Sequence, residues 1–136
     1  MNVNVKWIEN AKMVGESGSG HRIVMDGPDS IGGENLGARP MEMVLLGLGG
    51  CATIDVITIL QKSRQSVTDC QVAISAERVD EIPGVFSEIH LHFIVSGENL
   101  KPSLVKRAVS LSADKYCSVS KMLEKTATIT HDYEIN

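Results

Sequence analysis

The chain has 136 residues, of which 43% are apolar and 22% are charged, a composition typical of a globular protein with an ordinary core. Its formal net charge is −4, so it lacks the positive excess that nucleic acids or anionic membrane surfaces attract. We therefore expect one domain over residues 1–136, with small molecules or proteins as partners, no nucleic acid and no membrane.

The first ten residues, MNVNVKWIEN, contain neither the basic region nor the apolar stretch of a secretory signal. We therefore expect a cytoplasmic location, in which the cysteines Cys51, Cys70 and Cys117 stay reduced. These cysteines lack the close C-x2-C spacing of a zinc site, and no phosphate-binding glycine motif occurs. The sequence accordingly predicts neither a metal nor a cofactor.

Two short strands are expected at the start of the chain. Residues 3–7 alternate apolar and polar side chains, and residues 21–26 form a second apolar segment. The glycines and serines of residues 15–20 predict the turn of a hairpin between them. Residues 27–39 are rich in glycine, and we interpret them as a plain connection, with a flexible loop over a pocket as the alternative.

Residues 40–64 predict one long helix. Pro40 suits its first turn and Glu42 suits the positive end of its dipole. Residues 43–60 are apolar or small on every side except for Asp55, so we expect burial all round. The length approaches the roughly 20 residues of a membrane span, but the acid and the glycines favour a core helix instead.

Two adjacent glycines, Gly49 and Gly50, lie in the middle of this helix. Each glycine costs about 1 kcal/mol relative to alanine, so we expect a compensating close approach to another helix or to a partner subunit. A simple kink without functional meaning is the alternative.

The remaining chain predicts two strands, a helix and a final strand. Residues 70–76 and 85–95 alternate with a period of two, residues 100–117 have a helical apolar stripe, and residues 127–135 alternate again. The order ββ–α–ββ–α–β implies an α+β fold with largely antiparallel pairing. His90 and His92 share one face of a strand and could bind a metal together, although an exposed polar face explains them more simply.

Cys51 is the first candidate for chemistry, because Gly49 and Gly50 leave one side of it bare and access favours a reactive thiol. Asp55 and Thr58 share its helical face. An ionised Asp55 disfavours a neighbouring thiolate, so an activating cation has to come from elsewhere. The sequence offers four such cations: Arg22, Arg39, Lys115 and Lys121.

Cys117 is the second candidate, and it can meet Cys51 only through folding. Two such cysteines are the layout of a thiol peroxidase or a redox sensor, while two buried structural thiols are the plain alternative.

Pro40-Met41-Glu42, the following Gly49-Gly50-Cys51 and the later Lys115-Tyr116-Cys117-Ser118 resemble motifs of the OsmC/Ohr family of hydroperoxide-reducing proteins, in its OsmC-like (YhfA-type) branch. The resemblance implies an α+β sandwich built by an intertwined homodimer, with the long cysteine-bearing helices at its centre. It also implies that Cys51 attacks an organic hydroperoxide, that Cys117 resolves the sulfenic acid to a disulfide, and that an external dithiol restores both thiols.

The acidic residue of the family directly follows the proline at the start of the helix, where this chain has Met41, and Glu42 comes one place later. On a straight helix Glu42 lies about 180° and roughly 13 Å from Cys51. The family also has an arginine in its N-terminal hairpin. This chain has no arginine at the matching position, because the nearby Arg22 is out of register. We predict Cys51, Cys117 and Glu42 as catalytic residues of a peroxidase that acts in oxidative stress. The alternatives are a dimer that binds a small apolar ligand and a redox-responsive dimer.

Overall fold

The structure is a computed structural model that describes residues 1–136. Its internal contacts divide the chain into two compact units, Met1–Leu46 and Gly47–Asn136, each with its own three-stranded sheet.

The sheet of the first unit is antiparallel in the order β1-β2-β3. Its strands are β1 (Val3–Glu9), β2 (Lys12–Ser17) and β3 (Arg22–Met25). The predicted turn at residues 15–20 is wrong in its first half, because residues 15–17 belong to β2, a strand that the prediction missed. The first hairpin turns at Asn10 instead, whose φ of 50° is left-handed, a conformation that asparagine tolerates. The Trp7 indole donates to the Asn10 carbonyl at 2.8 Å.

The loop after β3 is ordered around the buried carboxylate of Asp26. That carboxylate accepts backbone N–H groups from Gly27 at 2.8 Å, Glu34 at 3.0 Å and Leu36 at 3.1 Å. The hydrogen bonds from Glu34 and Leu36 lower the pKa of Asp26. The loop includes the short helix η1 (Asp29–Ile31).

Helix α1 runs from Pro40 to Lys62, close to the predicted range. One face is buried, with Leu48, Ala52, Val56 and Leu60 almost wholly inaccessible, while Ile54 on another face is 67% exposed. The prediction that α1 is buried on every side is therefore wrong for a single chain. By length and hydropathy α1 meets the requirements of a membrane span, a test that core helices of soluble proteins also pass.

Gly49 lets α1 approach strand β4. A Cβ atom at this position would lie 3.2 Å from Ile74 Cδ1 and 3.4 Å from Val72 Cγ1, tighter than ordinary van der Waals contact. The expected close approach is therefore made to a sheet of the same chain and not to a helix. A Cβ atom at Gly50 would have no neighbour within 4 Å, so no contact within the chain explains why this residue is a glycine.

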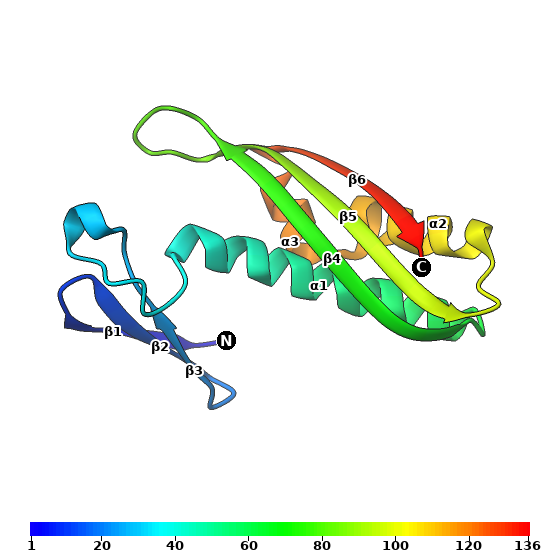
Figure 1. Ribbon diagram of the computed structural model, residues 1–136, viewed down its shortest axis with the longest axis horizontal. Coiled ribbons are helices and arrows are strands. Elements are labelled where there is room, and N and C mark those ends of the chain that lie inside the picture. The colour runs from blue at the N-terminus through cyan, green and yellow to red at the C-terminus, as the bar shows by residue number, and fades with distance from the viewer. The chain divides into compact units, whose positions relative to one another are not determined.

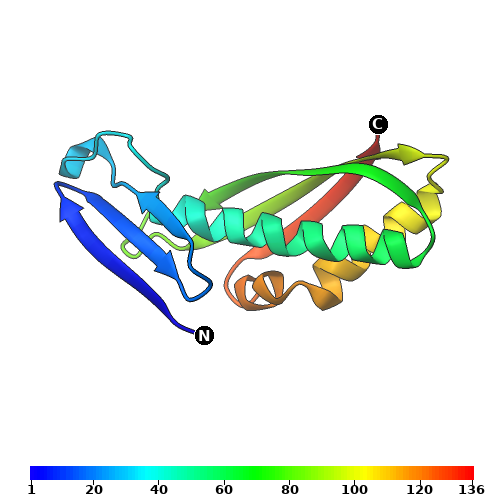
Figure 2. The ribbon, with the colours of Figure 1, turned by 90° about the horizontal axis from the view of Figure 1, so that it is seen from below.

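The sheet of the second unit pairs β4 with β5 in antiparallel fashion and β5 with β6 in parallel. Its strands are β4 (Ser66–Arg78), β5 (Phe86–Glu98) and β6 (Thr128–Ile135). Helix α1 from Gly47 onward and the later helices lie on one face of this sheet (Figures 1 and 2). The residues of β5 that face the helices, Ile89, Leu91, Phe93 and Val95, are buried as their alternation predicted.

The helix expected at residues 100–117 is interrupted. Helix α2 spans Pro102–Leu111, a π-helical turn η2 spans Ser112–Tyr116, and helix α3 spans Ser118–Leu123. The prediction is wrong after Leu111, where the Ser112 hydroxyl donates to the Ala52 carbonyl of α1 and the chain forms a π-helical turn. Together the two sheets and three α-helices form the predicted α+β fold.

Candidate functional site

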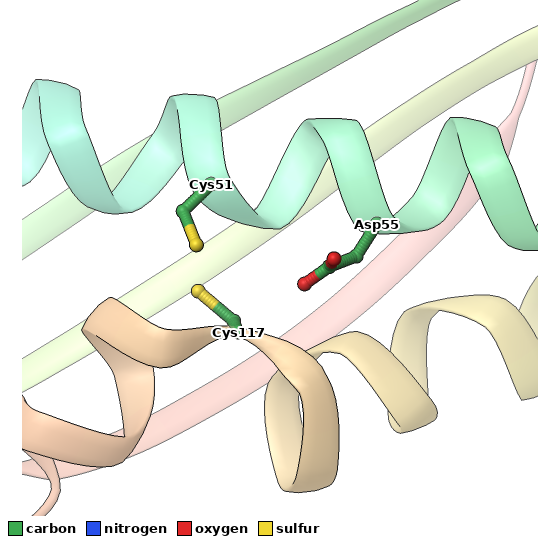
Figure 3. Close-up of side chains that lie close together, drawn as sticks. All are labelled: Cys51, Asp55 and Cys117. Carbon is green, nitrogen blue, oxygen red and sulfur yellow. The ribbon is translucent and has the colours of Figure 1, made fainter.

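Cys51 lies on α1 with its side chain half-buried. Asp55 follows one helical turn later, and its carboxylate is also half-buried. The two side chains therefore share the face of α1 that is turned toward the segment after α2 (Figure 3).

Cys117 reaches this face because the second helix is broken. Its backbone is extended, with φ −70° and ψ 108°, between the π-helical turn and α3. Its Sγ atom accepts the N–H of Ser120 at 3.4 Å and so caps α3. The side chain is fully buried and directed toward α1.

Cys51, Asp55 and Cys117 form one cluster, which we call the thiol cluster. Their two sulfur atoms and one carboxylate oxygen all lie within 4.8 Å of one another. Figure 3 shows the two sulfurs facing each other across the space between α1 and the start of α3, with the carboxylate beside them. Both cysteines are free thiols, so the structure represents a reduced pair.

The electrostatics of the cluster distinguish its two thiols. Burial raises the pKa of Cys117; the hydrogen bond from Ser120 opposes this shift, and the neighbouring Cys51 adds to it. Cys117 therefore keeps its proton at neutral pH. The half-buried Cys51 is the more accessible thiol of the pair.

Ser112 is a residue of the site that was not predicted from the sequence. Its buried hydroxyl lies 3.2 Å from the Ala52 carbonyl and 3.4 Å from Asp55 Oδ2, and it can donate to either oxygen. The serine thus links the π-helical turn to α1 and orients the Asp55 carboxylate. No local motif marks it, because the contact joins segments far apart in the sequence.

The predicted acid Glu42 lies in the first unit, at the start of α1. Its Oε1 accepts the backbone N–H of Arg39 at 2.7 Å and closes the first turn of the helix. The catalytic role of Glu42 stays a prediction.

The four candidate cations make other contacts. Arg22 pairs with Glu16 at 3.8 Å, Arg39 donates to the Asn35 side chain at 3.3 Å, Lys115 lies 5.3 Å from the centre of the Tyr116 ring, and Lys121 pairs with Glu124 at 3.1 Å. None of these four contacts involves a thiol.

A groove of about 670 Å³ is lined by α1, α2 and the π-helical turn, and Asp55 is one of its lining residues. Its walls combine apolar side chains with two cations, Lys62 and Arg107. Its lining residues are Ile54, Asp55, Thr58, Ile59, Lys62, Ser63, Arg107, Leu111 and Tyr116. An apolar groove with a positive region suits a small amphipathic molecule that carries an acidic group.

The remaining thiol, Cys70, lies on β4 and faces partly inward, as its apolar alternation predicted. Burial raises the pKa of Cys70, and the adjacent Asp69 adds to this effect. Cys70 is outside the thiol cluster.

Comparison with known proteins agrees with this fold. The model of a family described as OsmC-like protein matches residues 32–132. The chain is 53% identical over 135 residues to the protein YhfA of Escherichia coli strain K12, which covers 99% of this chain and 98% of YhfA.

Solved structures agree as well. A hypothetical protein from Aquifex aeolicus VF5 is 26% identical with a TM-score of 0.83, over 99% of this chain and 96% of that one. An organic hydroperoxide resistance protein OsmC from Legionella pneumophila has a TM-score of 0.74 at 14% identity, over 98% of this chain and 97% of that one, a likeness of fold alone. On the family match and the identity to YhfA, the chain belongs to the OsmC-like family.

Proposed function

We propose that the protein reduces organic hydroperoxides with the thiols of Cys51 and Cys117. The observation that carries the proposal is the position of the two sulfurs, which face each other beside a groove that can hold a small organic molecule. Related folds include an organic hydroperoxide resistance protein, which supports the same class of substrate.

The reaction takes two steps at the thiol cluster. Cys51, as a thiolate, attacks one peroxide oxygen; the O–O bond breaks, Cys51 becomes a sulfenic acid, and the alkoxide takes a proton and leaves as the alcohol. The Cys117 sulfur then attacks the sulfenic sulfur, and the displaced hydroxide leaves as water with the Cys117 proton. The two thiols have lost two electrons, and the peroxide has gained them.

The raised pKa of Cys117 suits the resolving role, because a protonated thiol does not compete with Cys51 for the peroxide. Glu42 is our candidate for the acid that protonates the alkoxide, contributed across the dimer, because on its own helix it lies roughly 13 Å from Cys51. An external dithiol in the cytoplasm reduces the disulfide and completes the cycle.

The test treats the reduced protein with an alkyl hydroperoxide and measures intact mass and peptide maps. We expect the loss of two hydrogens per chain and a disulfide between Cys51 and Cys117. Cys51→Ser should abolish peroxide consumption, whereas Cys117→Ser should still react once and accumulate a sulfenic acid that dimedone traps. Cys70→Ser, the matched control, should behave as the unmodified protein.

A second candidate function is the binding of a small acidic amphiphile in the groove that Lys62 and Arg107 line. Unchanged thiols after peroxide treatment would refute the peroxidase proposal. If native mass spectrometry of the same sample then shows a copurifying ligand, the binding function is favoured.

A further inference from the structure

We propose that the reduced thiol cluster is a binding site for a thiophilic divalent metal ion, Zn²⁺ above all, with Cys51, Asp55 and Cys117 as its protein ligands. The sequence predicts no metal, because the three donors are not close enough along the chain to form a recognisable motif. Only the fold brings them together.

The donor set matches the preferences of zinc. Two thiolates and one carboxylate combine ligand types that Zn²⁺ accepts, whereas magnesium and calcium select oxygen donors alone. Tetrahedral bonds of about 2.0–2.3 Å place donor atoms roughly 3.5–3.8 Å apart. The three donor atoms lie within 4.8 Å of one another, so side-chain adjustments of about 1 Å or less would close the site.

The surrounding structure orients the three donors. Cys51 and Asp55 are one turn apart on α1, and Cys117 faces them from the start of α3, so the donors converge from two sides (Figure 3). The Ser112 hydroxyl lies 3.4 Å from one Asp55 oxygen, which leaves the other oxygen available for a metal. An outer hydrogen bond of this kind orients a ligating carboxylate and contributes to metal affinity.

The site has room for a fourth ligand. Cys51 and Asp55 are half-buried, and Asp55 also lines the groove beside α1. A water molecule or another small ligand can therefore complete a tetrahedron from the groove side, as in metal sites with three protein ligands.

Metal binding and disulfide formation exclude each other, because both use the same two sulfurs. If the proposed peroxide chemistry is correct, the metal-bound dithiolate, one hydroperoxide and two protons yield the disulfide, one alcohol, one water and the free metal ion. The thiolates are oxidised by two electrons, and the peroxide is reduced by two. Metal binding itself does not depend on that activity.

The test uses the full-length, metal-free, reduced protein and Co²⁺ as a spectroscopic probe. We expect one equivalent to bind, with sulfur-to-cobalt charge-transfer absorption and the visible bands of a tetrahedral ion, and Zn²⁺ to displace it. Cys51→Ser and Cys117→Ser should lose most of the charge-transfer absorption. Asp55→Asn should weaken metal binding by about tenfold or more. Loss of only a hydrogen-bond partner of a metal ligand already lowers metal affinity by about 10–100-fold.

Controls separate a specific site from a folding defect. Cys70→Ser removes the thiol outside the cluster and should leave the spectrum unchanged. Diamide oxidation of the unmodified protein to the Cys51–Cys117 disulfide should abolish binding without any substitution. The proposal is overturned if Co²⁺ binding lacks charge transfer, or if it survives both cysteine substitutions or the disulfide.

The outcome also distinguishes this proposal from the proposed enzyme. If metal-free protein forms the disulfide with peroxide but binds no Co²⁺, the metal site is refuted and the peroxidase stands. If Co²⁺ binds through both thiols while peroxide leaves them unchanged, the peroxidase is refuted and the metal site stands.

Discussion

Asp132 on β6 joins the two histidines of β5 that the sequence placed on one face. Its Oδ1 lies 2.6 Å from His92 Nδ1 and 3.1 Å from His90 Nε2, and Glu134 Oε1 lies 3.5 Å from His92 Nε2. The hydrogen bond that His92 donates to the Asp132 carboxylate raises the pKa of His92 and lowers the pKa of Asp132. The parallel register of β5 and β6 creates this pairing.

The pair of His92 and Asp132 should make the stability of the fold depend on pH. The contribution of His92 is complete below its unfolded pKa of about 6.5 and is lost as pH rises through the higher folded value. That of Asp132 is present above its unfolded pKa of about 3.9 and is lost as pH falls through the lower folded value. Asp132→Asn should therefore lower the melting temperature more at about pH 5.5 than at about pH 8.5.

Thermal unfolding of both proteins at the two pH values measures this effect. Glu88→Gln removes a carboxylate of β5, the strand of the two histidines, that forms no ion pair, so its effect should not change with pH in this way. A melting-temperature difference for Asp132→Asn that is equal at both pH values would contradict the prediction.

At the scale of elements, β5 has one face in the core and one outside it. Phe93 is wholly buried, while its neighbour Ile94 points to the other face and is only half-buried. Phe93→Ala should lower the free energy of unfolding by about 3–5 kcal/mol, because it leaves a cavity under the helices. Ile94→Ala should cost clearly less.

Urea unfolding at one fixed protein concentration compares the two variants. The fixed concentration matters because unfolding of a dimer depends on it. Equal losses for Phe93→Ala and Ile94→Ala would contradict a core confined to one face of the sheet.

The elements also show where local sequence patterns suffice. Strand β5, strand β6 and helix α1 were predicted within a few residues, because alternation and helical periodicity record which side of an element meets water. Strand β2 was missed, because Gly15, Glu16 and Ser17 have turn-like composition although they pair with β1 and β3. The break after Leu111 was also missed, because it is stabilised by contacts of Ser112 with α1, sixty positions earlier in the chain.

At the scale of the whole molecule, apolar side chains remain exposed on both units. Val3, Val5 and Trp7 on β1 are more than half exposed, and so is Ile54 on α1. Soluble proteins rarely leave such surfaces uncovered, and members of this family are generally dimeric, which supports a homodimer.

The exposed side of α1 should contribute to that dimer. Ile54→Asp places a charge where a second subunit would bury it, so we expect dimerisation to weaken by about tenfold or more. Lys106→Asp is the control, because Lys106 is an exposed charged residue of α2. Sedimentation velocity over a range of concentrations measures the dimerisation of both variants. An unchanged dimer in Ile54→Asp would exclude this side of α1 from the interface.

The sequence by itself determined the α+β class, the long helix with Cys51 and the buried face of β5, because these follow from the solvation of each residue and its near neighbours. Resemblance added the pairing of Cys51 with Cys117. Only the tertiary structure decided that β5 and β6 are parallel, that Cys117 caps a separate helix, and that Asp55 and Ser112 join the thiols. Those contacts depend on how distant segments turn and pack, and no local periodicity encodes them.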